Sequence, residues 1–103
     1  MLFNEHQLRL WLNMLKSIEN FRKKELQYYD LVGELEGTLD AGEFQNEELI
    51  NQWYDYWTPL EILRVHKGNN VTLEDVNKYL FTMETFLKNT YINQLERHKT
   101  NHD

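Results

Sequence analysis

The chain has no cysteine, a single proline and only four glycines among its 103 residues. Without cysteine it can form neither a disulfide framework nor a cysteine-ligated metal site. The scarcity of glycine and proline disfavours a fold of many short strands joined by tight turns. No apolar run approaches the roughly 20 residues that a helix needs to cross a bilayer, and the N-terminus lacks the basic start and apolar centre of a signal peptide. We therefore expect a cytoplasmic protein without membrane contact.

Apolar side chains recur instead at the spacing of helices, and hydrophobic residues make up 41% of the chain. This content is enough for one core and argues against disorder. No segment alternates with the period of two that is typical of a strand. The clearest helical series extends over about five turns and comprises Val76, Tyr79, Leu80, Met83, Phe86, Leu87 and Tyr91. The sequence predicts an all-α fold, a small antiparallel helical bundle of about four helices that forms a single domain over residues 1–103.

Capping residues mark the expected helix ends. Asn4, Asn46 and Thr72 are suited to begin helices, because their side chains can accept a hydrogen bond from the first turn. Gly42 and Gly68 are suited to end them. These positions divide the chain into the segments from which the bundle is built.

Three helix ends are not defined by these capping residues. Residues 4–39 contain no strong breaker and could form one helix or two, but one helix would be over roughly 50 Å long, so we expect a break near residues 21–25. Because Thr58 to Glu61 has the pattern of a capping box around Pro59, the third helix is expected to be interrupted or kinked there. The polar residues 97–103 are expected to fray.

Charge is distributed unevenly along the chain. Between Glu25 and Leu63 there is no lysine or arginine but there are ten acidic residues, whereas the remainder has seven acids and all eleven basic residues. A field of one sign attracts basic surfaces and speeds association with them. A solvated acidic surface that only keeps the protein soluble is the alternative interpretation.

Aromatic residues cluster in the same acidic segment. Residues 53–57 place Trp53, Tyr54, Tyr56 and Trp57 around a full helical turn, so they cannot all face one core. Trp53 is expected inside and Tyr54 elsewhere, and one of the pair Tyr28 and Tyr29 is expected at the core boundary. Tyrosine and tryptophan surrounded by carboxylates are typical of interfaces that select a basic partner, although large rings can equally fill the core of a small bundle.

Signatures of catalysis are missing. The chain has no phosphate-binding glycine loop, no cysteine nucleophile and no pair of carboxylates in an apolar setting, so we expect no enzyme and no cofactor. His98 and His102, with Asp103 beside them, have a spacing that can bind a metal on a helix, but they lack the glutamate partner of the HExxH type, and we expect no metal site. The basic run at residues 22–24 is too short for direct nucleic-acid binding.

Composition and one short segment resemble those of a known class of proteins. A small, acidic, cysteine-free helical protein with a tyrosine-rich stretch running into a proline, as in Tyr54 to Pro59, resembles bacterial immunity proteins that inhibit nuclease toxins. The resemblance implies a module that neutralises or regulates a basic protein partner, most concretely a toxin. The expected partner-binding residues are Tyr28, Tyr29, Glu34, Glu36, Asp40, Glu43, Glu47, Glu48, Tyr54, Asp55 and Glu61.

Two further functions fit the same sequence. A phage or plasmid inhibitor could use these carboxylates to mimic nucleic acid and block a defence nuclease. A homodimeric assembly protein could use exposed rings as its subunit interface.

Overall fold

Four α-helices follow one another along the chain in the computed structural model, which describes residues 2–100. They are α1 (Glu5–Arg22), α2 (Tyr28–Ala41), α3 (Glu47–Lys67) and α4 (Leu73–Thr100), with a short 3₁₀ turn, η1 (Gly68–Asn70), between the last two. No strand occurs in this part of the chain. The prediction of an all-α bundle of about four helices is confirmed.

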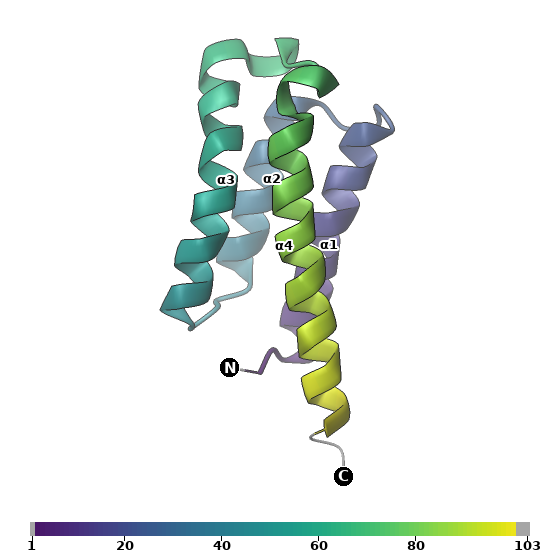
Figure 1. The fold of residues 1–103 in the computed structure, drawn as a ribbon, viewed down its shortest axis with the longest axis vertical. Helices are drawn as coiled ribbons and strands as arrows, with labels where there is room; N and C mark the ends of the chain where they lie inside the picture. Colours follow the sequence, from purple (N-terminus) through teal and green to yellow (C-terminus); the bar gives the residue numbers. More distant parts are fainter. Residues whose placement is uncertain (1, 101–103) are drawn as a thin grey trace.

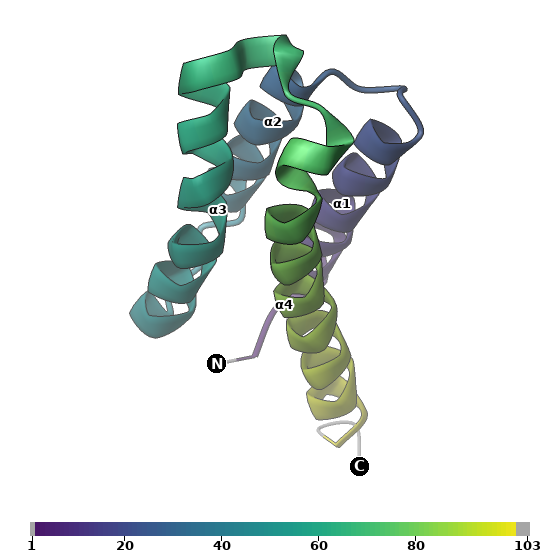
Figure 2. The ribbon, with the colours of Figure 1, turned by 45° about the horizontal axis from the view of Figure 1, so that its top comes forward.

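The helices run alternately up and down, so that each packs antiparallel to its neighbours in sequence (Figure 1). α1 contacts α2 and α4, and α3 contacts the same two helices from the other side. The C-terminal turns of α4 extend beyond the ends of the other helices (Figures 1 and 2), which gives the molecule extents of 50 × 26 × 21 Å. This order leaves two outer faces along α3, one shared with α2 and one shared with α4.

The predicted caps begin the helices. The Asn4 side chain accepts a hydrogen bond of 2.7 Å from the backbone nitrogen of Gln7, and the Gln7 side-chain oxygen accepts one of 3.0 Å from the backbone nitrogen of Asn4. Asn46 accepts from the nitrogen of Leu49. Thr72 and Asp75 make the reciprocal pair at the start of α4. Each bond satisfies a backbone group that a helix end would otherwise leave unpaired.

Residues 4–39 form two helices. α1 ends at Arg22, and the chain reverses through residues 23–27, where Lys24 adopts a left-handed φ of 63°. The expected break near residues 21–25 is confirmed. At the other end of α2, Gly42 lies against the ring of Phe44, and a Cβ built at Gly42 would overlap that ring. Glycine at this position therefore allows the close approach of Phe44, which is buried.

Pro59 lies inside α3 without interrupting it. The helix is continuous from Glu47 to Lys67, so the predicted interruption was wrong, and a kink at Pro59 stays a prediction. The reason is packing: Trp57 and Leu60, on either side of Pro59, are both buried in the core and hold the backbone helical. Proline removes one helical hydrogen bond and crowds the preceding turn, which costs about 3 kcal/mol in a helix interior.

Replacing Pro59 should accordingly stabilise the protein. We expect Pro59→Ala to raise the free energy of unfolding by about 2 kcal/mol, because the missing hydrogen bond is restored while the more flexible unfolded chain offsets part of the gain. Urea denaturation followed by circular dichroism measures the change. A loss of stability would show instead that the half-buried proline ring contributes more to packing than it costs the helix.

The core is rich in aromatic rings and ties the chain ends together. Phe3, Trp11 and Phe44 pack with ring centroids 5.0 to 5.3 Å apart. The nitrogen of Phe3 donates to the buried Gln94 side chain at 2.8 Å, and a ring nitrogen of His98 lies 2.6 Å from the Phe3 carbonyl oxygen. Thus residues 97–100, part of the tail expected to fray, continue α4 as helix. Residues 101–103 of that tail lie outside the described part of the chain.

Candidate functional site

Several of the predicted partner-binding residues meet on the surface where α2 lies beside α3. We call this surface the α2–α3 face and define it by Tyr29, Glu36, Asp40, Glu43, Tyr54 and Glu61. Tyr54 and Glu61 lie on α3. The residues on α2 are Tyr29, Glu36 and Asp40, and Glu43 lies in the turn that joins the two helices. The antiparallel pairing of α2 and α3 therefore gathers residues that are up to 32 positions apart in the sequence.

Tyr54 is the centre of this face. Its hydroxyl donates a hydrogen bond of 3.0 Å to Glu36, and its ring packs edge-on against Trp53 and Trp57, with centroids 5.1 and 5.6 Å away. Burial, the bond to Glu36 and the charge of Asp40 raise the pKa of Tyr54 to about 12. The phenol consequently stays a neutral donor at physiological pH, and its ring is held in one orientation.

A small hollow opens next to Tyr54. It has a volume of about 160 Å³ and an apolar floor made by Leu39, Phe44 and Ile50, while Asp40 and Glu43 stand at its edge. Both carboxylates are exposed. An apolar floor with negative charge at the rim matches the side chain of lysine or arginine, whose stem is apolar and whose end is a cation.

The other end of the face is partly neutralised by its own arginine. Arg64 binds Glu61 with two parallel hydrogen bonds, of 2.7 and 2.5 Å, and its guanidinium lies 4.7 Å from the centroid of the Tyr29 ring. The hydrogen bond from Arg64 holds the pKa of Glu61 below its usual range. Glu61 is therefore less available to a cationic partner than Glu36, Asp40 and Glu43.

The Glu61 interaction predicts a dependence of stability on pH. Because the pKa of Glu61 is lower in the folded protein than its ordinary value of 4.5, the pair stabilises the fold above pH 4.5 and the effect is lost as pH falls through the folded value. Glu61→Gln should thus be less stable than the wild type at pH 7, and the difference should shrink as the pH falls below 4.5. Urea denaturation of both proteins at pH 7 and at a series of pH values below 4.5 measures this. A difference that does not change with pH would mean that the charge of Glu61 contributes nothing.

The remaining predicted residues lie elsewhere. Tyr28 is buried, and its hydroxyl donates to the carbonyl oxygen of Leu60 at 2.6 Å, so Tyr29 is the member of the pair that a partner can reach. Glu34 faces α1, where it accepts a hydrogen bond from Ser17. Three more predicted carboxylates lie exposed on α3 and make no side-chain hydrogen bond to Tyr54. They are Glu47, Glu48 and Asp55.

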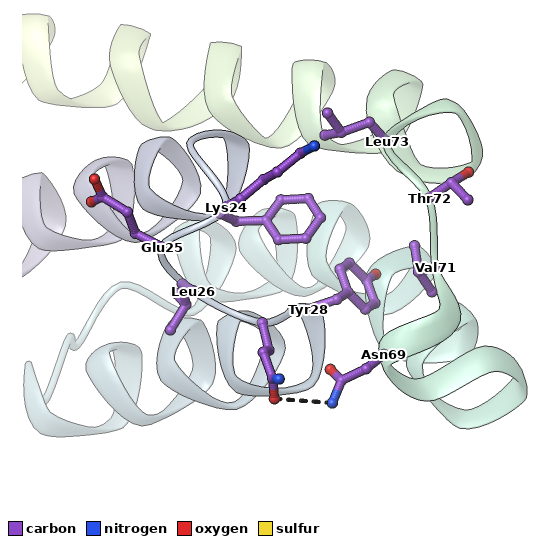
Figure 3. Close-up of a pocket in the computed structure, with 10 residues that line it drawn as sticks. Lys24, Glu25, Leu26, Tyr28, Asn69, Val71, Thr72 and Leu73 are labelled. Atoms are coloured by element: carbon purple, nitrogen blue, oxygen red, sulfur yellow. Dashed lines mark hydrogen bonds between the residues drawn. The ribbon is translucent and has the colours of Figure 1, made fainter.

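A larger hollow lies at the opposite end of the bundle from Tyr54. It measures about 510 Å³ and lies between the α1–α2 turn and the segment that leads into α4, lined in part by Lys24, Tyr28 and Thr72 (Figure 3). Asn69 accepts a hydrogen bond from the nitrogen of Tyr29 at 2.9 Å and donates one to Gln27 at 3.1 Å. Gln27 provides no side-chain cap for α2, so Asn69 supplies it from η1. This contact fixes the start of α2 and thereby the position of Tyr29.

Two of these features were missed by sequence reasoning. The pair Glu61 and Arg64 has the i, i+3 spacing that favours an ion pair within a helix, and that spacing was the available signal. The cap that Asn69 provides for α2 has no signal, because the two segments are 40 residues apart and meet only in the folded chain.

Among residues 2–100, no three histidine, aspartate or glutamate side chains lie close enough together to hold a metal ion. His102, half of the histidine pair considered above, lies outside these residues. In the same part of the chain no helix combines the length and the apolar character that crossing a membrane requires. The chain matches no protein-family model, no curated protein and no solved structure.

Proposed function

We propose that this protein is a cytoplasmic binding module that neutralises or regulates a basic protein, most concretely as an immunity or antitoxin-type inhibitor of a bacterial toxin. The observation that carries the proposal is the arrangement around Tyr54: a ring held by Glu36 beside an apolar hollow with Asp40 and Glu43 at its rim. In this proposal a lysine or arginine of the partner enters the hollow and lies against the Tyr54 ring.

Two physical effects support binding at this place. Rigid aromatic side chains with little entropy to lose are the usual anchors of protein interfaces. Carboxylates at the rim attract a basic surface from a distance and increase the rate of encounter. The stretch from Glu25 to Leu63 contains both the aromatic anchor, Tyr54, and the carboxylates. It carries no lysine or arginine that would weaken their attraction for a basic partner.

Affinity capture tests the proposal. The tagged protein is exposed to lysate at low salt, eluted with high salt, and the eluate is identified by mass spectrometry. We expect a basic protein that is retained by the wild type and lost from the double variant Asp40→Asn, Glu43→Gln.

The matched control is the double variant Glu25→Gln, Glu74→Gln, which removes the same charge at the other end of the bundle. It should retain the partner. Equal capture by both double variants would contradict the proposed site. Release of the partner by duplex DNA, together with full binding by Tyr54→Ala, would favour the nucleic-acid mimic over the toxin inhibitor.

A further inference from the structure

One end of the α2–α3 face already holds a guanidinium of the chain itself. Arg64 lies 4.7 Å from the centroid of the Tyr29 ring and binds Glu61 through two parallel hydrogen bonds of 2.7 and 2.5 Å. A tyrosine ring and a carboxylate thus hold an arginine side chain there. This contact shows which cation the groups of this face accommodate.

The other end has the same kinds of groups around the hollow beside Tyr54. The residues that line this hollow are Leu39, Asp40, Glu43, Phe44, Ile50 and Tyr54, and none of them is basic. Glu36 binds the Tyr54 hydroxyl. Glu47 lies three positions before Ile50 and seven before Tyr54, so helical spacing places it on the same side of α3. The charged residues that α2, α3 and their connecting turn bring to this hollow are therefore all acidic.

Glu43 reaches the rim of the hollow from an unfavourable backbone conformation. Its φ of 48° lies in the left-handed region, which glycine adopts without strain and other residues adopt rarely. Directly before it the chain has a glycine, Gly42, with an ordinary φ of −79°. Side chains held in such conformations are frequent at binding sites, where the surrounding structure maintains them. The conformation supports a role of the Glu43 carboxylate in binding.

We infer that the basic side chain that the hollow accepts from the partner is an arginine rather than a lysine. The inference rests on the proposed function, because it names the residue that occupies the same site. In the complex the guanidinium lies on the Tyr54 ring and donates hydrogen bonds to Asp40 and Glu43, which repeats the contacts that Arg64 makes at the other end of the face.

The physical difference between the two cations selects arginine. A guanidinium is planar, carries five N–H donors and is more weakly hydrated than an ammonium. It can therefore lie flat on the Tyr54 ring above the apolar floor and still donate to two separate carboxylates. The compact ammonium of lysine holds its water more strongly, so it loses more when it enters a hollow whose floor offers no hydrogen-bond acceptor.

Two peptides of equal charge test the inference: tetra-arginine and tetra-lysine, each acetylated at the N-terminus and amidated at the C-terminus. The full chain is titrated with each peptide at low salt and followed by two-dimensional NMR of its backbone amides. We expect tetra-arginine to bind about tenfold more tightly, equivalent to about 1.4 kcal/mol, and to shift the signals of residues 39–44 and of Tyr54.

Variants show whether the preference for arginine arises at the hollow. Tyr54→Ala and the double variant Asp40→Asn, Glu43→Gln should remove most of the preference, and circular dichroism checks that both fold. The double variant Glu25→Gln, Glu74→Gln removes the same charge elsewhere and should keep it.

The outcomes separate this inference from the proposed function. Equal affinity for the two peptides, or a preference that both site variants retain, would overturn the choice of arginine. The partner site itself would remain, provided that capture of the partner still depends on Asp40 and Glu43. If neither peptide shifted the signals around the hollow, the site would be contradicted, and the inference with it.

Discussion

Trp11→Ala is expected to reduce the free energy of unfolding by about 4 kcal/mol, the typical cost of truncating a fully buried tryptophan. Trp11 is completely buried, packs against Phe3, Phe44 and Phe86, and donates its indole hydrogen to the carbonyl oxygen of Leu87 at 2.9 Å. It therefore links α1 to α4, to the N-terminal segment and to the α2–α3 turn. Since a domain of this size is stable by about 5 to 15 kcal/mol, the variant should unfold at far lower urea concentration, as measured by circular dichroism.

A conservative variant separates packing from hydrogen bonding at this position. Trp11→Phe keeps an aromatic ring and removes the indole donor, so we expect a loss of about 1 to 2 kcal/mol. Leu2→Ala, at a side chain 42% exposed, is the control for a truncation outside the core and should have little effect. If Trp11→Ala cost no more than Leu2→Ala, the cluster of Phe3, Trp11 and Phe44 would not be the centre of the core.

Tyr54→Ala should weaken binding of the basic partner about 30-fold, equivalent to about 2 kcal/mol, through faster dissociation. Removal of the ring takes away the anchor beside the hollow and leaves Glu36 without its hydrogen bond. Replacing Asp40 and Glu43 by their amides should act differently. It should slow association about tenfold at low salt, because the steering charge is lost while the anchor remains.

Surface plasmon resonance with the captured partner, at two salt concentrations, distinguishes the two effects. Tyr91→Ala removes another partly buried tyrosine, on α4, and serves as the control; it should leave both rate constants unchanged. Binding that does not depend on salt, or that tolerates Tyr54→Ala, would refute the proposed role of the α2–α3 face.

The sequence by itself determined the helices and most of their ends. Capping side chains act within three residues of the helix start, as Asn4, Asn46 and Thr72 do, so the interactions that place these ends are visible in a short stretch of sequence. The periodic apolar residues that predicted the helices are likewise a local pattern. The same local signals predicted that Gly42 ends a helix, but they did not predict its close contact with Phe44.

At Pro59 the packing of the core outweighs the local tendency of proline to interrupt a helix. The local pattern predicted an interruption or a kink, but no interruption occurs: the helix is continuous, with Trp53, Trp57 and Leu60 all buried on one side of α3. The burial of several large apolar side chains outweighs the roughly 3 kcal/mol that a proline costs inside a helix. The balance depends on what lies opposite those side chains, which the sequence alone does not state.

Only the tertiary structure decided how the acidic and aromatic residues are shared among the faces. Tyr28 and Tyr29 are adjacent and chemically identical, yet one is buried against Leu60 and the other is open to solvent. Glu34 and Glu36 are two residues apart, yet the first faces α1 and the second accepts a hydrogen bond from Tyr54. Adjacent or alternate positions on a helix point in different directions, and which helix lies on each side is set by the packing of all four.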